Sequence, residues 1–376
     1  MHIWHKILIF APKDKRMRYC IIIGYLVVMS MTVCAQTKRY LGGDVSMLPS
    51  YEQQGTVYKD FEGRQVKLLP FLKRQGWNMM RVRLFVDPQN APEGHKGQGV
   101  CQDLNYVIGL CRQIKKTGMQ VMLDFHYSDT WADPAKQFTP KRWEHCDAKS
   151  LTDSVYAYTR YSLLAMKKAG VAPEMIQVGN EITNGMLWPT GQLYKKTDSS
   201  TGSETDSTAT KERWDILCNL IKAGSKACRE ICPKAQIIIH TEKAGNWDVT
   251  RNYYTQLRQR GVDYDIIGLS YYPMWHGTIP NLGQTLNRLS WLFPEKPVMI
   301  VETAAEYYNS IEGQAQFTRE LVDELKRHHN VTGLFWWFPE ENAYGNKVTR
   351  GRLNRGLFDN NTGQVLPAMK EFNRFR

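Results

Sequence analysis

The chain of 376 residues has no apolar run long enough to cross a membrane. Its longest run, Cys20 to Val33, spans about 14 residues, whereas a membrane-spanning helix needs about 20. The sequence also has no internal repeat. Hydrophobic residues make up 42% and charged residues 23%, which is enough to bury a core. These features exclude a polytopic membrane protein, a fibrous repeat and large-scale disorder.

The N-terminal segment is typical of a secretory signal peptide. Basic residues between Lys13 and Arg18 precede the apolar run, which ends at Val33-Cys34-Ala35. A basic region, a short apolar stretch and small residues before a cleavage point define such a leader. The sequence therefore predicts removal of residues 1–35 by cleavage near Ala35, and a periplasmic, secreted or cell-surface location in a bacterium. A retained anchor, or a lipid on Cys34, is the alternative.

The net charge of +12 raises the question of a nucleic-acid partner. The leader holds five basic residues and one acidic residue, so the mature chain carries +8. A nucleic-acid site would be a basic stripe on one element. The densest basic cluster lacks interleaved aromatic residues and comprises Lys347, Arg350, Arg352 and Arg355. We therefore expect a solvated basic surface, no nucleic-acid partner and no stable protein partner, with a monomer as the default state.

Cysteine is sparse in the mature chain, with Cys101, Cys111, Cys146, Cys218, Cys228 and Cys232. An exported protein can oxidise them, and sequence alone does not resolve the pairing. Cys228 and Cys232 lie four residues apart, on one face of a predicted helix. A metal site would need two further ligands nearby, and the sequence shows none, so buried thiols or a disulfide are favoured.

Short apolar runs alternate with helical stretches along the mature chain, which predicts parallel β/α units. The eight predicted strands are Tyr40–Asp44, Met79–Phe85, Gln120–Phe125, Met175–Gly179, Gln236–His240, Ile266–Ser270, Val298–Glu302 and Gly333–Phe338. Eight units indicate a single-domain (β/α)₈ TIM barrel over 36–376. A doubly wound open sheet is the alternative, but no glycine-rich phosphate loop follows the first strand. The polar stretch from Lys195 to Thr210 is predicted to be a flexible insert.

Polar and aromatic residues collect where the predicted strands end, which is the functional face of such a barrel. They are Asp44, Arg83, His126, Asn180, Glu181, His240, Tyr271 or Tyr272, Glu302 and Trp337. Glu181 and Glu302 follow strands four and seven, on opposite sides of the barrel. Two facing carboxyls are the requirement for cleaving a glycosidic bond. Arg83 is predicted to keep Glu302 ionised, while a less solvated Glu181 stays protonated.

Aromatic residues in the loops after the strands fit the same chemistry, because sugar faces stack on them. These are Trp131, Trp188, Trp275 and Trp337. Packing within the loops is the alternative for each.

Several motifs resemble glycoside hydrolase family 53, the arabinogalactan endo-β-1,4-galactanases of the 4/7 superfamily. They are GGDVSMLPSYEQQG at 42–55, MRVRLFVDP at 80–88, LDFHYSDTWADPAKQ at 123–137, IQVGNEITNGMLWPTG at 176–191, GLSYYPMWHG at 268–277 and VMIVETA at 298–304. The resemblance implies a retaining, endo-acting enzyme that cuts β-1,4-linked galactose chains, such as the galactan side chains of pectin.

The resemblance also implies a role for individual residues. Glu181 would be the acid/base and Glu302 the nucleophile, and Asn180 would bind the sugar 2-hydroxyl. Three strand-end residues would support them, namely Arg83, His126 and His240, and one tyrosine of Tyr271 and Tyr272 would lie beside the nucleophile.

Two other functions stay open at this stage: an endo-glycanase acting on mannan, xylan or glucan, and a non-catalytic glycan-binding barrel. Some members of the family carry structural calcium. The Asn342–Gly351 loop shows no acidic cage, so we expect no cofactor and no metal.

Overall fold

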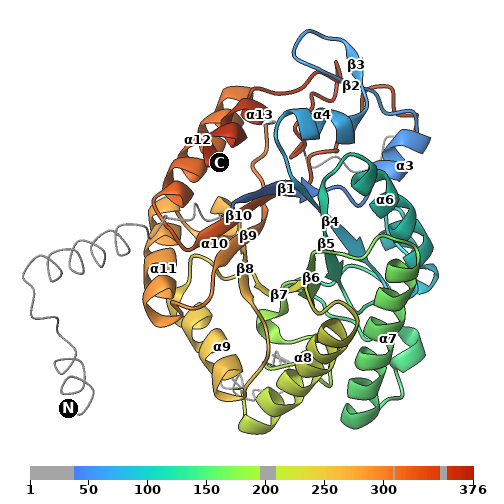
Figure 1. Cartoon of the computed structure of the whole chain (residues 1–376), viewed down its shortest axis with the longest axis vertical. Helices are drawn as coiled ribbons and strands as arrows, with labels where there is room; N and C mark the ends of the chain where they lie inside the picture. Colours follow the sequence, from blue (N-terminus) through green and yellow to red (C-terminus); the bar gives the residue numbers. More distant parts are fainter. Residues whose placement is uncertain (1–37, 195–208, 308–309, 348–353) are drawn as a thin grey trace, which may run out of the picture. The chain divides into compact units, whose positions relative to one another are not determined.

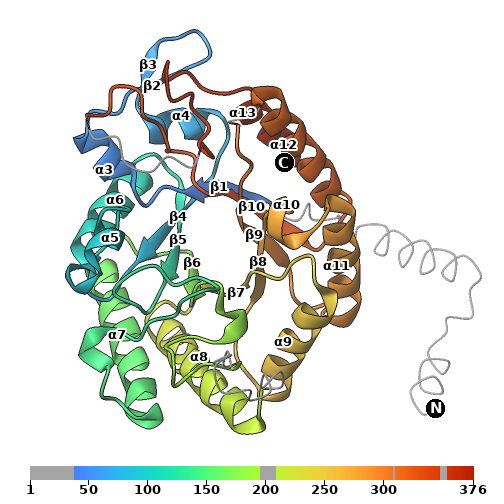
Figure 2. The same ribbon diagram turned by 180° about the vertical axis from the view of Figure 1, so that it is seen from behind.

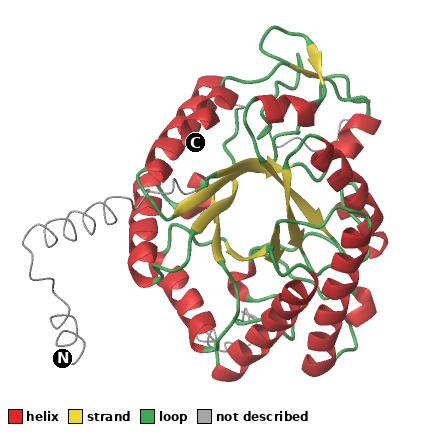
Figure 3. Ribbon diagram, in the orientation of Figure 1, coloured by secondary structure: helices red, strands yellow, loops and turns green. Residues whose placement is uncertain are grey.

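The computed structural model describes residues 38–194, 209–307, 310–347 and 354–376. Within the compact unit Arg39–Arg376, eight parallel strands close into a barrel in the order β1-β10-β9-β8-β7-β6-β5-β4. The helices surround this barrel (Figures 1 and 3). The ring closes because β1 pairs with both β10 and β4. The predicted single-domain (β/α)₈ barrel is therefore confirmed, and the open sheet is excluded.

All eight predicted strands are present; two have the predicted bounds, and the ends of the other six differ by one or two residues. The barrel strands are β1 (Tyr40–Asp44), β4 (Met79–Leu84), β5 (Gln120–Phe125), β6 (Met175–Val178), β7 (Gln236–Thr241), β8 (Ile266–Tyr271), β9 (Val298–Thr303) and β10 (Val331–Trp336). The largest difference is in β10, which begins two residues before the prediction and ends two residues earlier. Trp337 therefore lies just beyond its strand.

The outer layer consists of α4 (Leu68–Arg74), α6 (Leu104–Lys116), α7 (Ala148–Lys168), α8 (Lys211–Ile231), α9 (Trp247–Gln259), α11 (Ile279–Leu292) and α12 (Ile311–Lys326). Figure 2 shows the same layer from the opposite side. All of these helices except α4 begin with a side chain that accepts a hydrogen bond from a first-turn amide, namely Asp103, Asp147, Thr210, Asn246, Thr278 and Ser310. Such caps satisfy amides that have no partner within the helix.

Short elements decorate the ends of the barrel. They are α3 (Leu48–Gln53), α5 (Glu93–Lys96), α10 (Pro273–His276), α13 (Ala368–Glu371) and the antiparallel pair β2 (Tyr58–Lys59) and β3 (Gln65–Val66). The 3₁₀ turns are Pro88–Asn90, Lys141–Trp143, Ile182–Asn184 and Phe372–Phe375.

Methionines fill much of the barrel interior below the functional face. One buried cluster combines Met79, Met122, Met175 and Met299 with Ile238, Ile266, Val301 and Phe335. No residue with a side chain fits in place of Gly42 on β1, because a Cβ atom there would lie 1.9 Å from the carbonyl oxygen of Met79. The filled interior makes the lower half of the barrel a rigid base.

Two predictions fall on segments that lie outside the described residues: the leader 1–35 and most of the 195–210 insert. Of that insert the structure describes Ala209 and Thr210, and Thr210 caps α8. No helix among the described residues is long and apolar enough to span a membrane. The six cysteines at positions 101, 111, 146, 218, 228 and 232 are free thiols, four of them buried.

Candidate active site

A cleft of about 1370 Å³ lies over the carboxyl ends of the barrel strands. The loops that follow β1, β4, β5, β6, β7, β8 and β10 contribute to its lining, and β9 contributes Glu302 itself. The predicted site residues that line it are Arg83, His126, Trp131, Asn180, Glu181, Tyr272, Trp275, Glu302 and Trp337. Residues spread over more than 250 positions of sequence thus meet around one opening.

Glu181 is held in an unusual backbone conformation just after β6. Its φ of 50° and ψ of 49° lie in the left-handed region, and Gly179 before it has a φ of 87°. Such a conformation is costly for a residue other than glycine and is maintained only by its surroundings. The turn leaves the Glu181 side chain 8% exposed, at the cleft. Its Oε1 accepts a hydrogen bond of 2.7 Å from the Ser270 hydroxyl.

Glu302 lies near the end of β9 and is 7% exposed. Its Oε1 accepts a 2.7 Å hydrogen bond from the Tyr272 hydroxyl, and its Oε2 lies 3.2 Å from Nη1 of Arg81. A cation and a hydroxyl donor therefore stabilise the ionised form of this carboxyl.

The two carboxyls are close, and their surroundings differ. One oxygen of Glu181, one oxygen of Glu302 and one ring nitrogen of His240 all lie within 4.8 Å of one another. Burial raises the pKa of Glu181 well above its usual value, and the nearby carboxyls of Glu302 and Glu242 raise it further. Burial also raises the pKa of Glu302, but Arg81 and Tyr272 oppose it. Of the two, Glu181 therefore holds a proton more strongly, and Glu302 carries the charge.

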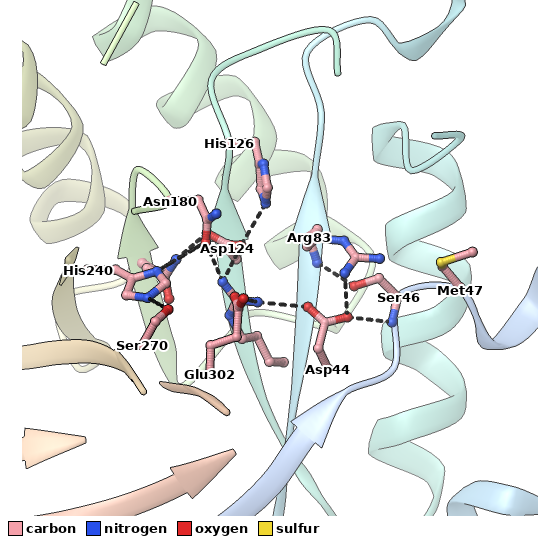
Figure 4. A network of polar contacts seen from close by, with 12 residues as sticks. Asp44, Ser46, Met47, Arg83, Asp124, His126, Asn180, His240, Ser270 and Glu302 are labelled. Carbon is pink, nitrogen blue, oxygen red and sulfur yellow. Dashed lines mark hydrogen bonds and ion pairs between the residues drawn. The ribbon is translucent and has the colours of Figure 1, made fainter. Parts of the chain in front are cut away.

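Arg81, and not Arg83, is the cation beside Glu302, which corrects the sequence prediction. Besides Glu302, the fully buried Arg81 guanidinium pairs with Asp44 at 2.9 Å and Asp124 at 2.8 Å. Arg83 pairs with the other oxygen of Asp44, at 3.2 Å (Figure 4). Both arginines point into the barrel because they are two residues apart on β4, but Arg81 lies one layer deeper.

His126 is neutral and fixed by two contacts. Its Nδ1 accepts a hydrogen bond from the Ala132 amide, so the hydrogen of the neutral ring is on Nε2, which lies 3.0 Å from Oδ2 of Asp124. Burial lowers the pKa of His126, which keeps the ring uncharged. The burial of Asp124 by itself raises its pKa, but Arg81 and His126 together lower that pKa to about 2.

The low pKa of Asp124 predicts a specific loss of stability in acid. Because this pKa lies below its value of 3.8 in the unfolded chain, ionised Asp124 stabilises the fold above about pH 4, and this contribution disappears as the pH falls toward 2. Asp124→Asn should lower the free energy of unfolding by at least about 2 kcal/mol at pH 7 and by much less at pH 2.5. Urea unfolding at both pH values measures the difference.

The matched control for this test is Asp153→Asn, since Asp153 is a largely exposed residue of α7 that pairs with Lys149. It should leave the free energy of unfolding almost unchanged. An equal deficit for Asp124→Asn at pH 7 and pH 2.5 would contradict the assignment of charge to Asp124.

Asn180, His240 and Asp44 lie around the base of the cleft. The Asn180 Oδ1 accepts a 2.6 Å hydrogen bond from Arg81, and its Nδ2 donates to the Ala132 carbonyl at 2.8 Å. These contacts fix the orientation of the amide, which lines the cleft next to Glu181. His240 and Asp44 are buried beneath the lining and contact it through Asn180 and the arginines.

Two of the candidate aromatic residues, Tyr271 and Trp188, do not line the cleft. Tyr271 points to the outside of β8, where its ring stacks on Phe317 of α12, because neighbouring residues of a strand face opposite ways. Tyr272 is the tyrosine that lies beside Glu302. The Trp188 indole donates to the Asn184 carbonyl at 2.9 Å, and its backbone pairs with Phe138, so it packs within its own loop.

The other three tryptophans line the cleft. Trp131 covers the Arg83 guanidinium, with 4.3 Å between that group and the ring centre. Trp275 is 63% exposed and lies near Trp337 on the other wall, where the guanidinium of Arg355 lies 5.3 Å and 5.8 Å from their ring centres. Exposed ring faces in an open cleft suit stacking on sugars.

Four residues of the site are not among those predicted from the sequence, namely Arg81, Asp124, Ser270 and Glu242. Three of them lie two residues before a predicted site residue, namely Arg83, His126 and Tyr272, so a period of two would have identified them as inward-facing. Glu242 follows β7, lines the cleft and accepts a hydrogen bond from Thr183. No periodic signal marks Glu242, since it lies in a loop.

Glu181, His240 and Glu302 are also the cluster, among the described residues, whose spacing could hold a metal ion. Each already makes hydrogen bonds: Glu181 and His240 with Ser270, and Glu302 with Tyr272 and Arg81. The adjacent Arg81 would also repel a cation. An acid–base pair therefore describes this cluster better than a metal site. Part of the Asn342–Gly351 loop lies outside the described residues, so the expected absence of calcium there stays a prediction.

Comparison with known proteins decides the family. The protein-family model described as "Glycosyl hydrolase family 53" matches residues 40–372, which include every residue that lines the cleft. The chain belongs to glycosyl hydrolase family 53. It is thus an enzyme of the glycosidase class.

The family 53 assignment agrees with individual relatives. An Aspergillus terreus protein named probable arabinogalactan endo-beta-1,4-galactanase A is 30% identical over 375 residues, which cover 93% of this chain and 98% of the relative. The endo-beta-1,4-galactanase of Bacillus subtilis is 31% identical, covering 85% and 73%. The Ignisphaera aggregans GH53 catalytic domain superposes with a TM-score of 0.77 at 30% identity, covering 90% and 96%.

Proposed function

We propose that this family 53 enzyme is an endo-β-1,4-galactanase that hydrolyses galactan, including type I arabinogalactan, with retention of configuration. The observation that carries the proposal is the pair Glu181 and Glu302. One carboxyl oxygen of each lies within 4.8 Å of the other, and Arg81 and Tyr272 stabilise the ionised form of Glu302, while burial and neighbouring carboxyls favour the protonated form of Glu181. Carboxyls about 5 Å apart are typical of retaining enzymes, whereas inverting enzymes separate them by about 6.5–9.5 Å. The names of the relatives support galactan as the substrate.

The geometry supports a double displacement. Glu302, ionised beside Arg81, attacks the anomeric carbon while Glu181 gives its proton to the departing glycosidic oxygen, so a covalent glycosyl ester forms. Glu181, now a carboxylate, then removes a proton from water, which attacks the same carbon and releases Glu302. The negative charge of Glu302 disappears in the first step and returns in the second. This alternation suits Glu302, because burial raises its pKa while Arg81 and Tyr272 lower it.

The shape of the cleft supports cleavage within a chain. Its lining extends from Met47 and Gln54 after β1 to Lys243 after β7, and it passes over both glutamates. Trp131 and Trp275 lie on different walls, which leaves stacking surfaces on more than one sugar position. A polymer can therefore cross the opening with residues on both sides of the scissile bond.

The test is reducing-sugar release from linear β-1,4-galactan in parallel with mannan, xylan and β-glucan. Galactan alone should be cut, to a mixture of short oligosaccharides, and proton NMR of the first product should show the β-anomer. Cleavage of another glycan would keep the mechanism and overturn the substrate. Binding without cleavage of any glycan would make the barrel a carbohydrate receptor.

We also propose that the enzyme acts outside the cytoplasm, without a metal cofactor, on the galactan side chains of pectin. The basic and apolar segments before Ala35 support export with removal of the leader. Activity that survives EDTA would support the absence of a metal requirement. A mass for the exported protein that begins at Gln36 would support cleavage.

A further inference from the structure

A closed ring of three hydrogen bonds begins and ends at Glu181. The Glu181 amide donates to Nδ1 of His240 at 3.3 Å, Nε2 of His240 lies 2.7 Å from Oγ of Ser270, and Ser270 donates to Oε1 of Glu181 at 2.7 Å. All three residues are buried, and His240 and Ser270 have no exposed surface. Figure 4 shows the contact between His240 and Ser270. The proposed double displacement gives no role to either His240 or Ser270.

The direction of this ring follows from the donors around His240. Burial lowers the pKa of His240 well below its usual value, with Arg81 contributing, so the ring is neutral and only one nitrogen carries hydrogen. Two donors face Nδ1: the Glu181 amide and, at 3.1 Å, the side-chain amide of Gln177. The hydrogen therefore resides on Nε2 and points at Ser270.

One acceptor also lies near Nδ1, and it has other donors. Oδ1 of Asn180 is 3.0 Å away, but it already receives hydrogen bonds from Arg81 at 2.6 Å and from Gln177 at 3.3 Å. The Gln177 amide cannot turn over, because the same nitrogen donates to Asp124 at 2.5 Å. This arrangement leaves Nδ1 as the acceptor.

The consequence concerns Ser270. Since its oxygen accepts from His240, its single hydrogen is directed to Oε1 of Glu181 whatever the state of that carboxyl. No hydrogen bond to Oε2 of Glu181 is present among the described residues. Oε2 is thus left for the substrate.

We propose that Ser270 is a positioning residue which, under the direction of His240, makes Oε1 a permanent acceptor and thereby confines the catalytic proton of Glu181 to Oε2. The inference rests on the proposed role of Glu181 as acid/base. The same hydrogen bond stabilises the carboxylate that must act as base in the second step. One hydroxyl therefore serves both halves of the reaction.

The test uses Ser270→Ala, which removes the donor, and Ser270→Thr, which keeps a hydroxyl. Selective ¹³C labelling of glutamate carboxyls, with the Glu181 signal identified by its absence in Glu181→Gln, measures the pKa of Glu181 directly by NMR. In Ser270→Ala this pKa should rise by about one unit, because a hydrogen bond to the charged form is lost. The alkaline limb of the pH profile of kcat/KM should move upward by the same amount.

The charged and titratable groups that face Glu181 are unchanged by the substitution, so they do not account for such a shift. They are Asp133 after β5, His240 and Glu242 on and after β7, Tyr272 after β8, and Glu302 on β9. Ser225→Ala is the matched control, since Ser225 is buried in α8, away from the cleft. Ser270→Cys, which keeps the volume and a weak donor, should give a smaller shift in the same direction.

The outcomes separate the two proposals. Wild-type enzyme that cuts no galactan would overturn the proposed function, and the NMR titration would still test the ring. A Glu181 pKa that is the same in Ser270→Ala, Ser270→Cys and wild type would overturn the positioning role. The positioning role would also be overturned if Ser225→Ala shifted the Glu181 pKa as much as Ser270→Ala does. It would be overturned as well if Ser270→Thr, which keeps the hydroxyl, shifted this pKa as much as Ser270→Ala.

Discussion

Glu302→Ala should lower galactan hydrolysis by about 10⁴-fold or more, since the proposed covalent intermediate cannot form without this carboxylate. The structure gives the reason that no neighbour can substitute. Asp44 and Asp124 share the Arg81 cation with Glu302, but they are buried beneath the cleft and are absent from its lining. Initial rates of reducing-sugar release measure the loss.

A chemical rescue makes this prediction specific. Azide can enter the space left by the missing carboxylate and attack from the same face, so Glu302→Ala should yield an α-galactosyl azide from an activated galactoside. In the wild type, a 2-fluoro galactoside should become attached to Glu302, and peptide mass spectrometry would locate it. Glu312→Ala, on the exposed first turn of α12, is the control and should behave as wild type. A label on another residue would contradict the assignment of Glu302.

Glu181→Ala should produce a loss that depends on the leaving group. Galactan should be cut about 10²- to 10⁴-fold more slowly, because its leaving oxygen needs a proton. A dinitrophenyl galactoside needs none, so its first step should remain fast and its second step, which requires a base, should become rate-limiting. A burst of dinitrophenol measured in rapid mixing would show this change.

The pH profile gives a second signature of Glu181. The raised pKa of this carboxyl predicts an alkaline limb in the wild type, where loss of the proton removes the acid. That limb should be absent in Glu181→Ala. Glu242→Gln, which changes the neighbouring buried carboxyl, should keep it. Equal losses of Glu181→Ala on both substrates would contradict the acid/base role.

Much of the molecule is determined by local patterns in the sequence. Strand and helix alternation predicts the barrel, because each β/α unit buries its apolar face only by packing on its neighbours. The rule that chemistry lies at the carboxyl ends of the strands then identifies Glu181 and Glu302 without any coordinates. Even the missed Arg81 and Ser270 are visible in retrospect as inward positions, two residues before Arg83 and Tyr272.

What only the tertiary structure decided is which of these inward side chains touch one another. Closing the barrel brings Arg81 from β4 into contact with Glu302 on β9, and Ser270 from β8 into contact with Glu181 after β6. Periodicity gives the side of the strand but neither the depth nor the angle around the barrel. The sequence pattern therefore predicts Arg83 beside Glu302, whereas Arg81 makes that contact. Loops set a second limit on prediction from sequence. Whether a loop tryptophan such as Trp188 packs within its loop or faces the cleft depends on contacts with residues about 50 positions away in sequence.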